Sequence, residues 1–310
     1  MGRLCHFLWV WDMEAGLINW LRIGALGIIW GSSFMAVTIA IKDFGPITVA
    51  AGRIAIGAII LLTLLRLLGL SLPSPRNANG RMVWLAAFGF GVMSMALPFF
   101  LLSWGQRYVA SGFAGVTMAA VPLLVLPLAH FLIIGERLTP RKTLGFVIGF
   151  AGVIVLIGLD AFNSSGLGLE PLARLACFAA AACYAFGGII AKLAPKVDPI
   201  AFATAATMLA ALIIVPTAIV LEGVPTDITT APLLAMIFLG VVPTAGANLL
   251  LVAVIRSAGP SFLSLVNYQV PVWSVVFGTL FLNEVLPTRT FFALGLILLG
   301  MAVSQRRKPH

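Results

Sequence analysis

The chain has 310 residues, of which 61% are apolar and only 9% are charged. A soluble domain carries roughly 25% charged residues because water must wet its surface. The composition therefore excludes an ordinary soluble protein and predicts a polytopic membrane protein whose surface faces lipid. The net charge of +9 does not arise from a clustered basic patch, so we interpret it as an orientation signal toward anionic membrane lipid and expect no nucleic-acid partner.

Long apolar windows predict ten transmembrane helices that are joined by short connections. In chain order, the expected spans are 22–42, 46–69, 82–105, 109–133, 142–159, 170–193, 199–221, 231–255, 259–282 and 289–304. Residues 1–21 are expected to form an uncleaved extension at the membrane interface, with Met13 as an alternative start. Residues 306–310 are expected to form a basic cytoplasmic tail.

Most of the 19 Lys and Arg residues fall in segments that are cytoplasmic if the N terminus is cytoplasmic. This bias follows the positive-inside rule, and a wrong number of helices would scramble it. We therefore expect both the N and C termini in the cytoplasm. Arg53 is the exception among the cations, because it remains inside the second expected helix.

The two halves of the chain resemble each other. Glu136 corresponds to Glu284, and Gly152 corresponds to Gly300, each at an offset of 148 residues. Pro122 also falls on Pro271 when the segment "YVASGFAGVTMAAVP" is aligned with "RSAGPSFLSLVNYQVP". Because these matches keep the same order, they indicate an internal repeat.

We assign the two repeats to residues 22–160 and 170–305. Each holds five expected helices, an odd number, so the second repeat must enter the membrane in the opposite orientation. Inverted repeats of this kind are common among secondary transporters, whose substrate site lies near the midplane between the repeats. The expected fold is therefore an all-α membrane protein with ten transmembrane helices, built as two inverted five-helix repeats.

Several segments carry a family resemblance. "ALGIIWGSSFMAV" in the first helix, "AAGRIAIGAIIL" in the second and "GERLTPRKTLGFVIGFAGVIVLIG" around the fifth resemble the EamA family of the drug/metabolite transporter superfamily. The resemblance covers essentially residues 20–305. It implies a carrier of the bacterial inner (plasma) membrane, often an exporter of amino acids or other small metabolites. The motifs do not fix the substrate.

Arg53 lies about seven residues into the second helix, roughly 10 Å from the outer end at about 1.5 Å per residue. A cation at this depth is costly unless it faces a polar cavity or a partner. One interpretation is an anchor for a substrate carboxylate or phosphate. The other is an arginine that reaches the outer interface or ties down loop carbonyls and helix ends.

Three polar residues of the ninth helix, Asn267, Tyr268 and Gln269, precede Pro271. Proline lacks an amide hydrogen, so it leaves the carbonyl of Asn267 without its helical partner. Unpaired backbone at membrane depth is tolerated where it lines a cavity, and we therefore expect these side chains to line the substrate pathway. The alternative is that they join neighbouring helices.

Trp30 and Ser33 lie near the middle of the first helix, and Tyr184 lies near the middle of the sixth. Trp30 and Tyr184 fall at related repeat positions, which favours them as walls of a substrate pocket; small residues such as Ser33 also permit close helix packing. His130, in the fourth helix, is a candidate for proton coupling because an unperturbed histidine titrates near neutral pH. The alternative is a buried, neutral, hydrogen-bonded histidine.

The rest of the sequence gives no catalytic motif. Walker, HExxH and GxSxG patterns are absent, and the few histidines and cysteines do not form a metal-ligand set. Every Asp and Glu maps to a helix end, a loop or a terminus, so no carboxylate relay crosses the membrane and the mode of coupling stays open. We expect no catalytic residue, metal or cofactor.

These observations favour a secondary transporter that exports amino acids or other small metabolites by alternating access. An importer or exchanger is the alternative, because orientation does not fix the direction of flux. A membrane-embedded lipid enzyme would need a catalytic pair at matched depth, which the acidic residues do not supply. The expected partners are a small-molecule solute and membrane lipid, and the sequence does not predict an oligomeric state.

Overall fold

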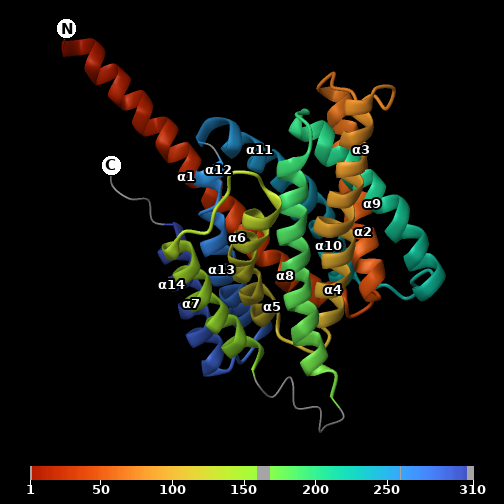
Figure 1. Cartoon of the computed structure of the whole chain (residues 1–310). Coiled ribbons are helices and arrows are strands. Elements are labelled where there is room, and N and C mark those ends of the chain that lie inside the picture. Colours follow the sequence, from red (N-terminus) through yellow and green to blue (C-terminus); the bar gives the residue numbers. More distant parts are fainter. Residues whose placement is uncertain (1, 159–167, 259, 306–310) are drawn as a thin grey trace.

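The computed structural model describes residues 2–158, 168–258 and 260–305, and in these ranges it contains helices and no strands. Eight helical spans in the described ranges are long and apolar enough to cross a membrane, and two shorter apolar helices accompany them. This all-helical, multi-span architecture agrees with the expected class of fold (Figure 1). The eight spans and the two shorter apolar helices follow the ten expected helices in order.

The helix bounds are, in chain order, α1 (Gly2–Ala40), α2 (Pro46–Leu67), α3 (Ala78–Gly91), η1 (Val92–Ala96), α4 (Leu97–Gly105), α5 (Ser111–Thr117), η2 (Met118–Ala120), α6 (Val121–Leu132), α7 (Pro140–Ile157), α8 (Glu170–Leu193), α9 (Pro199–Glu222), α10 (Thr230–Leu239), η4 (Gly240–Gly246), α11 (Ala247–Ala258), α12 (Pro260–Leu263), α13 (Val266–Leu282) and α14 (Thr288–Gln305). The third, fourth and eighth spans each combine an α-helix, a short π- or 3₁₀-helical segment and a second α-helix.

The first helix is longer than the sequence suggested. It begins at Gly2, and its first turns project from the bundle in Figure 1. The part that is apolar enough to span a membrane starts at Gly16. Residues 2–21 are therefore helical and continuous with the rest of α1. The physical reason is that no proline, the strongest helix breaker, occurs before the expected start of the span.

Proline and a capping side chain define the start of several helices. Pro140 is the first residue of α7, and the hydroxyl of Thr139 accepts a hydrogen bond from the backbone N–H of Lys142 at 3.3 Å. The Asp198 carboxylate caps α9 in the same way, accepting from the backbone N–H of Ile200 at 2.9 Å. These caps satisfy amides that have no partner inside the helix, so they fix where each helix begins.

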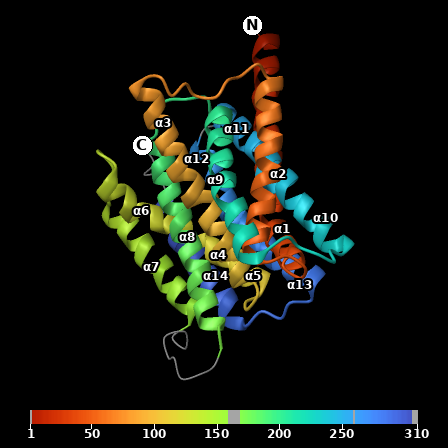
Figure 2. The ribbon, with the colours of Figure 1, turned by 90° about the vertical axis from the view of Figure 1, so that its right-hand side faces the viewer.

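Buried apolar side chains hold the two halves of the chain together. The largest buried cluster includes Leu26 of α1, Val116 of α5, Cys177 of α8 and Ile297 of α14. Figure 2 shows α9 of the second half between α2 and α3 of the first half. The halves therefore interdigitate, and the space enclosed between them receives side chains from both.

Two spans contain a π-helical segment, one in each half of the chain. The first segment, η1, ends immediately before Leu97, and Pro98 is the next residue. The second segment, η4, contains Pro243. Proline cannot donate the backbone hydrogen bond of a regular helix, so its neighbours shift to a wider turn. Both segments lie near the middle of their spans.

Candidate functional site

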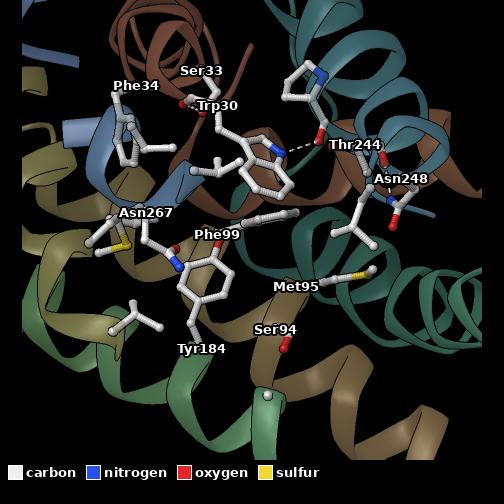
Figure 3. Close-up of a pocket in the computed structure, with 18 of the residues that line it drawn as sticks. Trp30, Ser33, Phe34, Ser94, Met95, Phe99, Tyr184, Thr244, Asn248 and Asn267 are labelled. Carbon is white, nitrogen blue, oxygen red and sulfur yellow. Dashed lines mark hydrogen bonds between the residues drawn. The ribbon is translucent and has the colours of Figure 1, made fainter. Parts of the chain in front are cut away.

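A cavity of about 530 Å³ lies inside the bundle, and Figure 3 shows residues from both halves of the chain around it. A volume of roughly 300–1,000 Å³ is typical of small-molecule sites. Most of the lining is apolar and includes Phe34, Phe90 and Phe99. The lining residues with polar groups in their side chains are Trp30, Ser33, Arg53, Ser94, Gln106, Tyr184, Thr244, Asn248, Ser264 and Asn267.

Arg53 of α2 is buried, with 6% of its surface exposed, and it lines the cavity. Its guanidinium carbon lies 3.7 Å from the centroid of the Phe99 ring, which is a cation–π contact. Its Nε donates to the hydroxyl of Thr244 at 3.3 Å. No ion pair joins Arg53 to a carboxylate among the described residues. The arrangement thus presents an uncompensated positive charge to the cavity.

Trp30 of α1 reaches the irregular part of the eighth span. Its indole Nε1 donates to the backbone carbonyl of Pro243 in η4 at 3.4 Å, as the dashed line in Figure 3 marks. The hydroxyl of Ser33 also lines the cavity, but it donates to the carbonyl of Trp30 at 2.6 Å in its own helix. Trp30 therefore ties α1 to η4, whereas the hydrogen of Ser33 is already engaged.

Tyr184 of α8 and Asn267 of α13 form another part of the wall. Figure 3 shows the side chain of Asn267 turned toward the ring of Tyr184. The Tyr184 ring packs near Phe99, with ring centroids 6.5 Å apart, and Asn267 donates to the carbonyl of Ser264 at 3.1 Å. Trp30 and Tyr184, the aromatic residues expected at related repeat positions, thus both line the cavity.

The structure also brings in residues that sequence reasoning did not select. Ser94 and Met95 come from η1, and Pro243 comes from η4. The available signal was a proline near the middle of the third and eighth spans. A proline at that depth leaves backbone groups unpaired, and such groups are tolerated where they line a cavity.

Gln106, at the end of α4, is a second residue outside the expected set. It is 5% exposed and lines the cavity. Its Oε1 accepts from the hydroxyl of Thr38 at 3.1 Å, whereas its Nε2 has no hydrogen-bond partner in the described structure. The hydrogen bond from Thr38 therefore holds the side-chain amide of Gln106 in place, and its buried Nε2 remains available as a donor. Nothing in the sequence distinguished this residue from other polar residues at helix ends.

Three expected site residues are not among those that line the cavity. Tyr268 packs against the large buried cluster, and Gln269 packs against Gly27 of α1, where an added Cβ would lie 2.7 Å from Oε1 of Gln269. His130 is exposed near the end of α6, and its Nδ1 accepts from the backbone N–H of Leu138 at 3.4 Å. The structure thus gathers Trp30, Ser33, Arg53, Tyr184 and Asn267 at one cavity and leaves the other three outside it.

The two repeat-related glutamates have different partners. Glu136 forms ion pairs with Lys192 at 2.8 Å and with Lys142 at 3.5 Å, and the hydrogen bond and charge of Lys192, aided by Lys142, lower the pKa of Glu136. Glu284 accepts hydrogen bonds from the backbone N–H groups of Ser111 at 2.7 Å and Gly112 at 3.0 Å. Both contacts join one half of the chain to the other.

Comparison with known proteins identifies the class. The model of the EamA-like transporter family matches residues 21–158 and again residues 172–305, so the chain belongs to this family. An uncharacterized transporter of Archaeoglobus fulgidus is 26% identical over 299 residues, covering 94% of this chain and 99% of that protein. The uncharacterized inner membrane transporter YedA of Escherichia coli is 29% identical over 288 residues, covering 90% of this chain and 88% of YedA.

A solved crystal structure supports the fold. It aligns with a TM-score of 0.64 at 20% sequence identity and covers 94% of this chain and 97% of that one. With the apolar helices, the family and these relatives identify a multi-pass inner-membrane protein of the transporter class. The relatives are named as transporters, and these names indicate no catalytic activity.

Proposed function

We propose that the chain is a secondary transporter that exports amino acids or other small metabolites by alternating access around the central cavity. The observation that carries this proposal is a cavity of small-molecule size, lined from both halves of the chain, with the buried Arg53 at its wall. A polar or ionisable side chain inside a membrane span is costly, and it is commonly kept for a substrate or ion pathway.

The proposed transport cycle needs two repeats of inverted topology, over residues 22–160 and 170–305. The two π-helical segments support this, since η1 begins at Val92 and η4 begins at Gly240, 148 residues later. This is the offset that relates Glu136 to Glu284 in the sequence. An irregularity at the same place in both halves is expected if both are versions of one five-helix unit.

Packing between α7 and α14 gives further support. A Cβ added to Gly300 would lie 2.5 Å from the carbonyl oxygen of Gly145, and one added to Gly152 would lie 3.0 Å from the carbonyl oxygen of Ala293. At the offset of 148 residues, Gly300 corresponds to Gly152 and Ala293 corresponds to Gly145. The two contacts are therefore equivalent if α7 and α14 exchange places. A two-fold axis in the membrane plane relates inverted repeats and would produce this exchange. With ten spans and the positive-inside bias, both termini are assigned to the cytoplasm.

Alternating access also requires contacts that close one end of the cavity at a time. Glu284, in the connection after α13, holds the start of α5 through two backbone N–H groups. At the other end of the bundle, Glu136 holds Lys192 of α8. Each contact crosses from one repeat to the other, so rocking of the repeats would break one of them while the other is kept.

The substrate site is assigned to Trp30, Ser33, Arg53, Tyr184 and Asn267, which line the cavity. Tyr268 and Gln269 are assigned a packing role beside them, because Gln269 contacts α1 and Tyr268 contacts the buried cluster. His130 is left out of the site since it lies exposed at the end of α6.

Counterflow in proteoliposomes tests this function. Vesicles that contain the purified chain and a pooled set of labelled metabolites should exchange at least one solute faster than vesicles that hold the same metabolites but lack the protein. Replacing Arg53 with Gln should reduce that exchange, while Arg66→Gln, an exposed arginine on the same helix, should leave it unchanged. Absence of exchange under every gradient would overturn the proposal, and inverted vesicles would distinguish export from import.

A further inference from the structure

We propose that the central cavity selects organic monoanions, namely a carboxylate joined to an apolar or aromatic body, over zwitterionic amino acids and over amines. The inference rests on the proposed transport function, because it names the substrate class of the same cavity. Its experiment measures binding alone, so that a failure of the inference and a failure of transport are distinguishable.

The charge of the lining is the first step. Arg53 is the sole Lys, Arg, Asp or Glu among the residues that line the cavity in the described part of the chain. A monoanion would neutralise this buried charge completely. A zwitterion would bring its own ammonium group into the cavity, where no carboxylate lines the wall to receive it. A buried charge without a partner is strongly unfavourable, so the net charge of the solute decides the preference.

The geometry of the guanidinium is the second step. The Phe99 ring covers one face of the Arg53 guanidinium, and Nε of Arg53 donates to the Thr244 hydroxyl. Within the described residues, the two terminal nitrogens of Arg53 make no hydrogen bond. Terminal guanidinium N–H groups match the two oxygens of a carboxylate in a bidentate pair. A phosphate monoester is mostly dianionic near neutral pH and would leave one negative charge uncompensated, which favours the carboxylate.

The apolar wall is the third step. The rings of Trp30, Phe99 and Tyr184 face the same space, as Figure 3 shows. Aromatic walls bury an apolar body favourably and gain from offset or edge-to-face ring contacts. A solute with an aromatic body next to its carboxylate would therefore fit both the charge and the wall of the cavity.

Gln106 adds a specificity determinant. Phe99, Leu102 and Gln106 share one face of α4, because they are spaced by three and four residues, and all three line the cavity. Gln106 thus lies two turns beyond Phe99, about 10 Å along the helix. Its Nε2, buried and without a partner, is free to donate to an acceptor at the far end of the solute. We assign it the recognition of a second polar group there.

The test uses four small probes that share a phenyl ring but differ in charge: 3-phenylpropionate, phenylalanine, 2-phenylethylamine and phenyl phosphate. Binding to the purified full chain in nanodiscs is measured by quenching of tryptophan fluorescence, since Trp30 lies in the wall. We expect 3-phenylpropionate to bind at least ten-fold more tightly than the other three. Equal or tighter binding of phenylalanine or the amine, tightest binding of phenyl phosphate, or no binding of any probe would each overturn the proposal.

Variants connect the preference to Arg53. Arg53→Gln should remove the preference for the monoanion, and Arg53→Lys should keep the sign of the preference with weaker binding, because lysine retains the charge but not the bidentate geometry. Arg66→Gln is the matched control and should bind as the unaltered chain does. If Arg53→Gln does not fold, Arg53→Lys and the four probes on the unaltered chain still decide. An undiminished preference in a folded Arg53→Gln protein would overturn the assignment.

The role of Gln106 is measured with a fifth probe, 3-(4-hydroxyphenyl)propionate, which carries a polar group at its far end. The unaltered chain should bind this probe several-fold more tightly than 3-phenylpropionate. Gln106→Leu should abolish that advantage. A hydroxyl advantage that survives Gln106→Leu would exclude Gln106 as the determinant. Loss of counterflow for every solute, with binding intact, would count against the transport function and not against this site.

Discussion

Glu284 and Ser111 lie 173 residues apart in the sequence, and the Glu284 carboxylate accepts a 2.7 Å hydrogen bond from the backbone N–H of Ser111. A second bond from Gly112 completes the contact. Hydrogen bonds from backbone amides to a carboxylate are stronger than neutral ones, and the start of a helix favours negative charge. This one side chain therefore fastens the connection after α13 to the start of α5.

Removing the carboxylate should loosen that end of the bundle. In a chain with Glu284→Ala, a cysteine introduced at Val37, which is 3% exposed and lines the cavity, should react about ten-fold faster with a membrane-impermeant thiol reagent added from outside the cell. Asp227→Asn is the control, because that acid has no hydrogen bond among the described contacts. Equal labelling rates in both variants would contradict a closing role for Glu284.

Glu136 should contribute a pH-dependent stability. Its pKa is lowered below the ordinary 4.5 by Lys192 and Lys142, so the folded state favours the ionised carboxylate. The contribution is fully present above pH 4.5 and is lost as the pH falls through the lowered pKa. Since the pair is partly exposed, its size should stay below about 1 kcal/mol.

The measurement is thermal unfolding of the purified chain and of Glu136→Gln from pH 7 to pH 3. The two proteins should differ slightly at pH 7 and converge at acidic pH, and added salt should reduce the difference. A gap that widens as the pH falls would show that the carboxylate is not stabilised in its charged form.

The contact between α7 and α14 should not tolerate a larger residue. Gly300→Val would place a Cβ 2.5 Å from the carbonyl oxygen of Gly145 and from the amide nitrogen of Gly149, which are backbone atoms that cannot move aside individually. Overpacking of this kind costs about 1–3 kcal/mol. Gly295→Ala on the same helix is the control, since nothing lies within 4 Å of its added Cβ.

Thermal unfolding in detergent is the readout. Gly300→Val should lower the unfolding temperature by several degrees, whereas Gly295→Ala should leave it unchanged or raise it slightly, because alanine is favoured over glycine in helices by about 1 kcal/mol. If both variants unfold alike, close packing at Gly300 does not matter for stability.

Thr244 should act on substrate binding through Arg53. Its hydroxyl accepts from Nε of Arg53 and donates to the carbonyl of Leu239 at 2.7 Å, so Thr244→Val removes the group that orients the guanidinium. The apparent KM of a transported monoanion should rise several-fold with little change in kcat. Thr217→Val is the matched control, because that hydroxyl also bonds a carbonyl of its own helix but lies away from the cavity. A change in kcat alone would argue against this role.

Much of the helical organisation could be predicted from the sequence. Lipid offers the backbone no hydrogen-bond partners, so a long apolar segment in a membrane satisfies its N–H and C=O groups within a helix. The start of α7 at Pro140 was predictable from Thr139, because the cap and the proline act locally. The start of α1 was not predicted, because the apolar pattern marks only the part of the helix that can cross a membrane, whereas the helix itself continues to Gly2.

The candidate site likewise contains residues that the sequence could indicate and residues that it could not. Arg53, Trp30 and Tyr184 could be selected because a cation or a pair of repeat-related aromatic residues stands out in an apolar span. Gln106 could not, because its significance lies in a donor left unpaired by the tertiary arrangement. Gln269 was selected for its polarity, yet its contact with Gly27 depends on how α13 meets α1, which no local pattern encodes.

The paired π-helical segments η1 and η4 bear on the ancestry of the chain. A π turn in an α-helix accommodates one extra residue, which a single-codon insertion supplies. If both halves descend from one ancestral unit, the simplest history places that insertion before the duplication, so that both copies inherited it. The ancestor would then have been a five-helix protein that enclosed a cavity only by pairing with a second copy of itself.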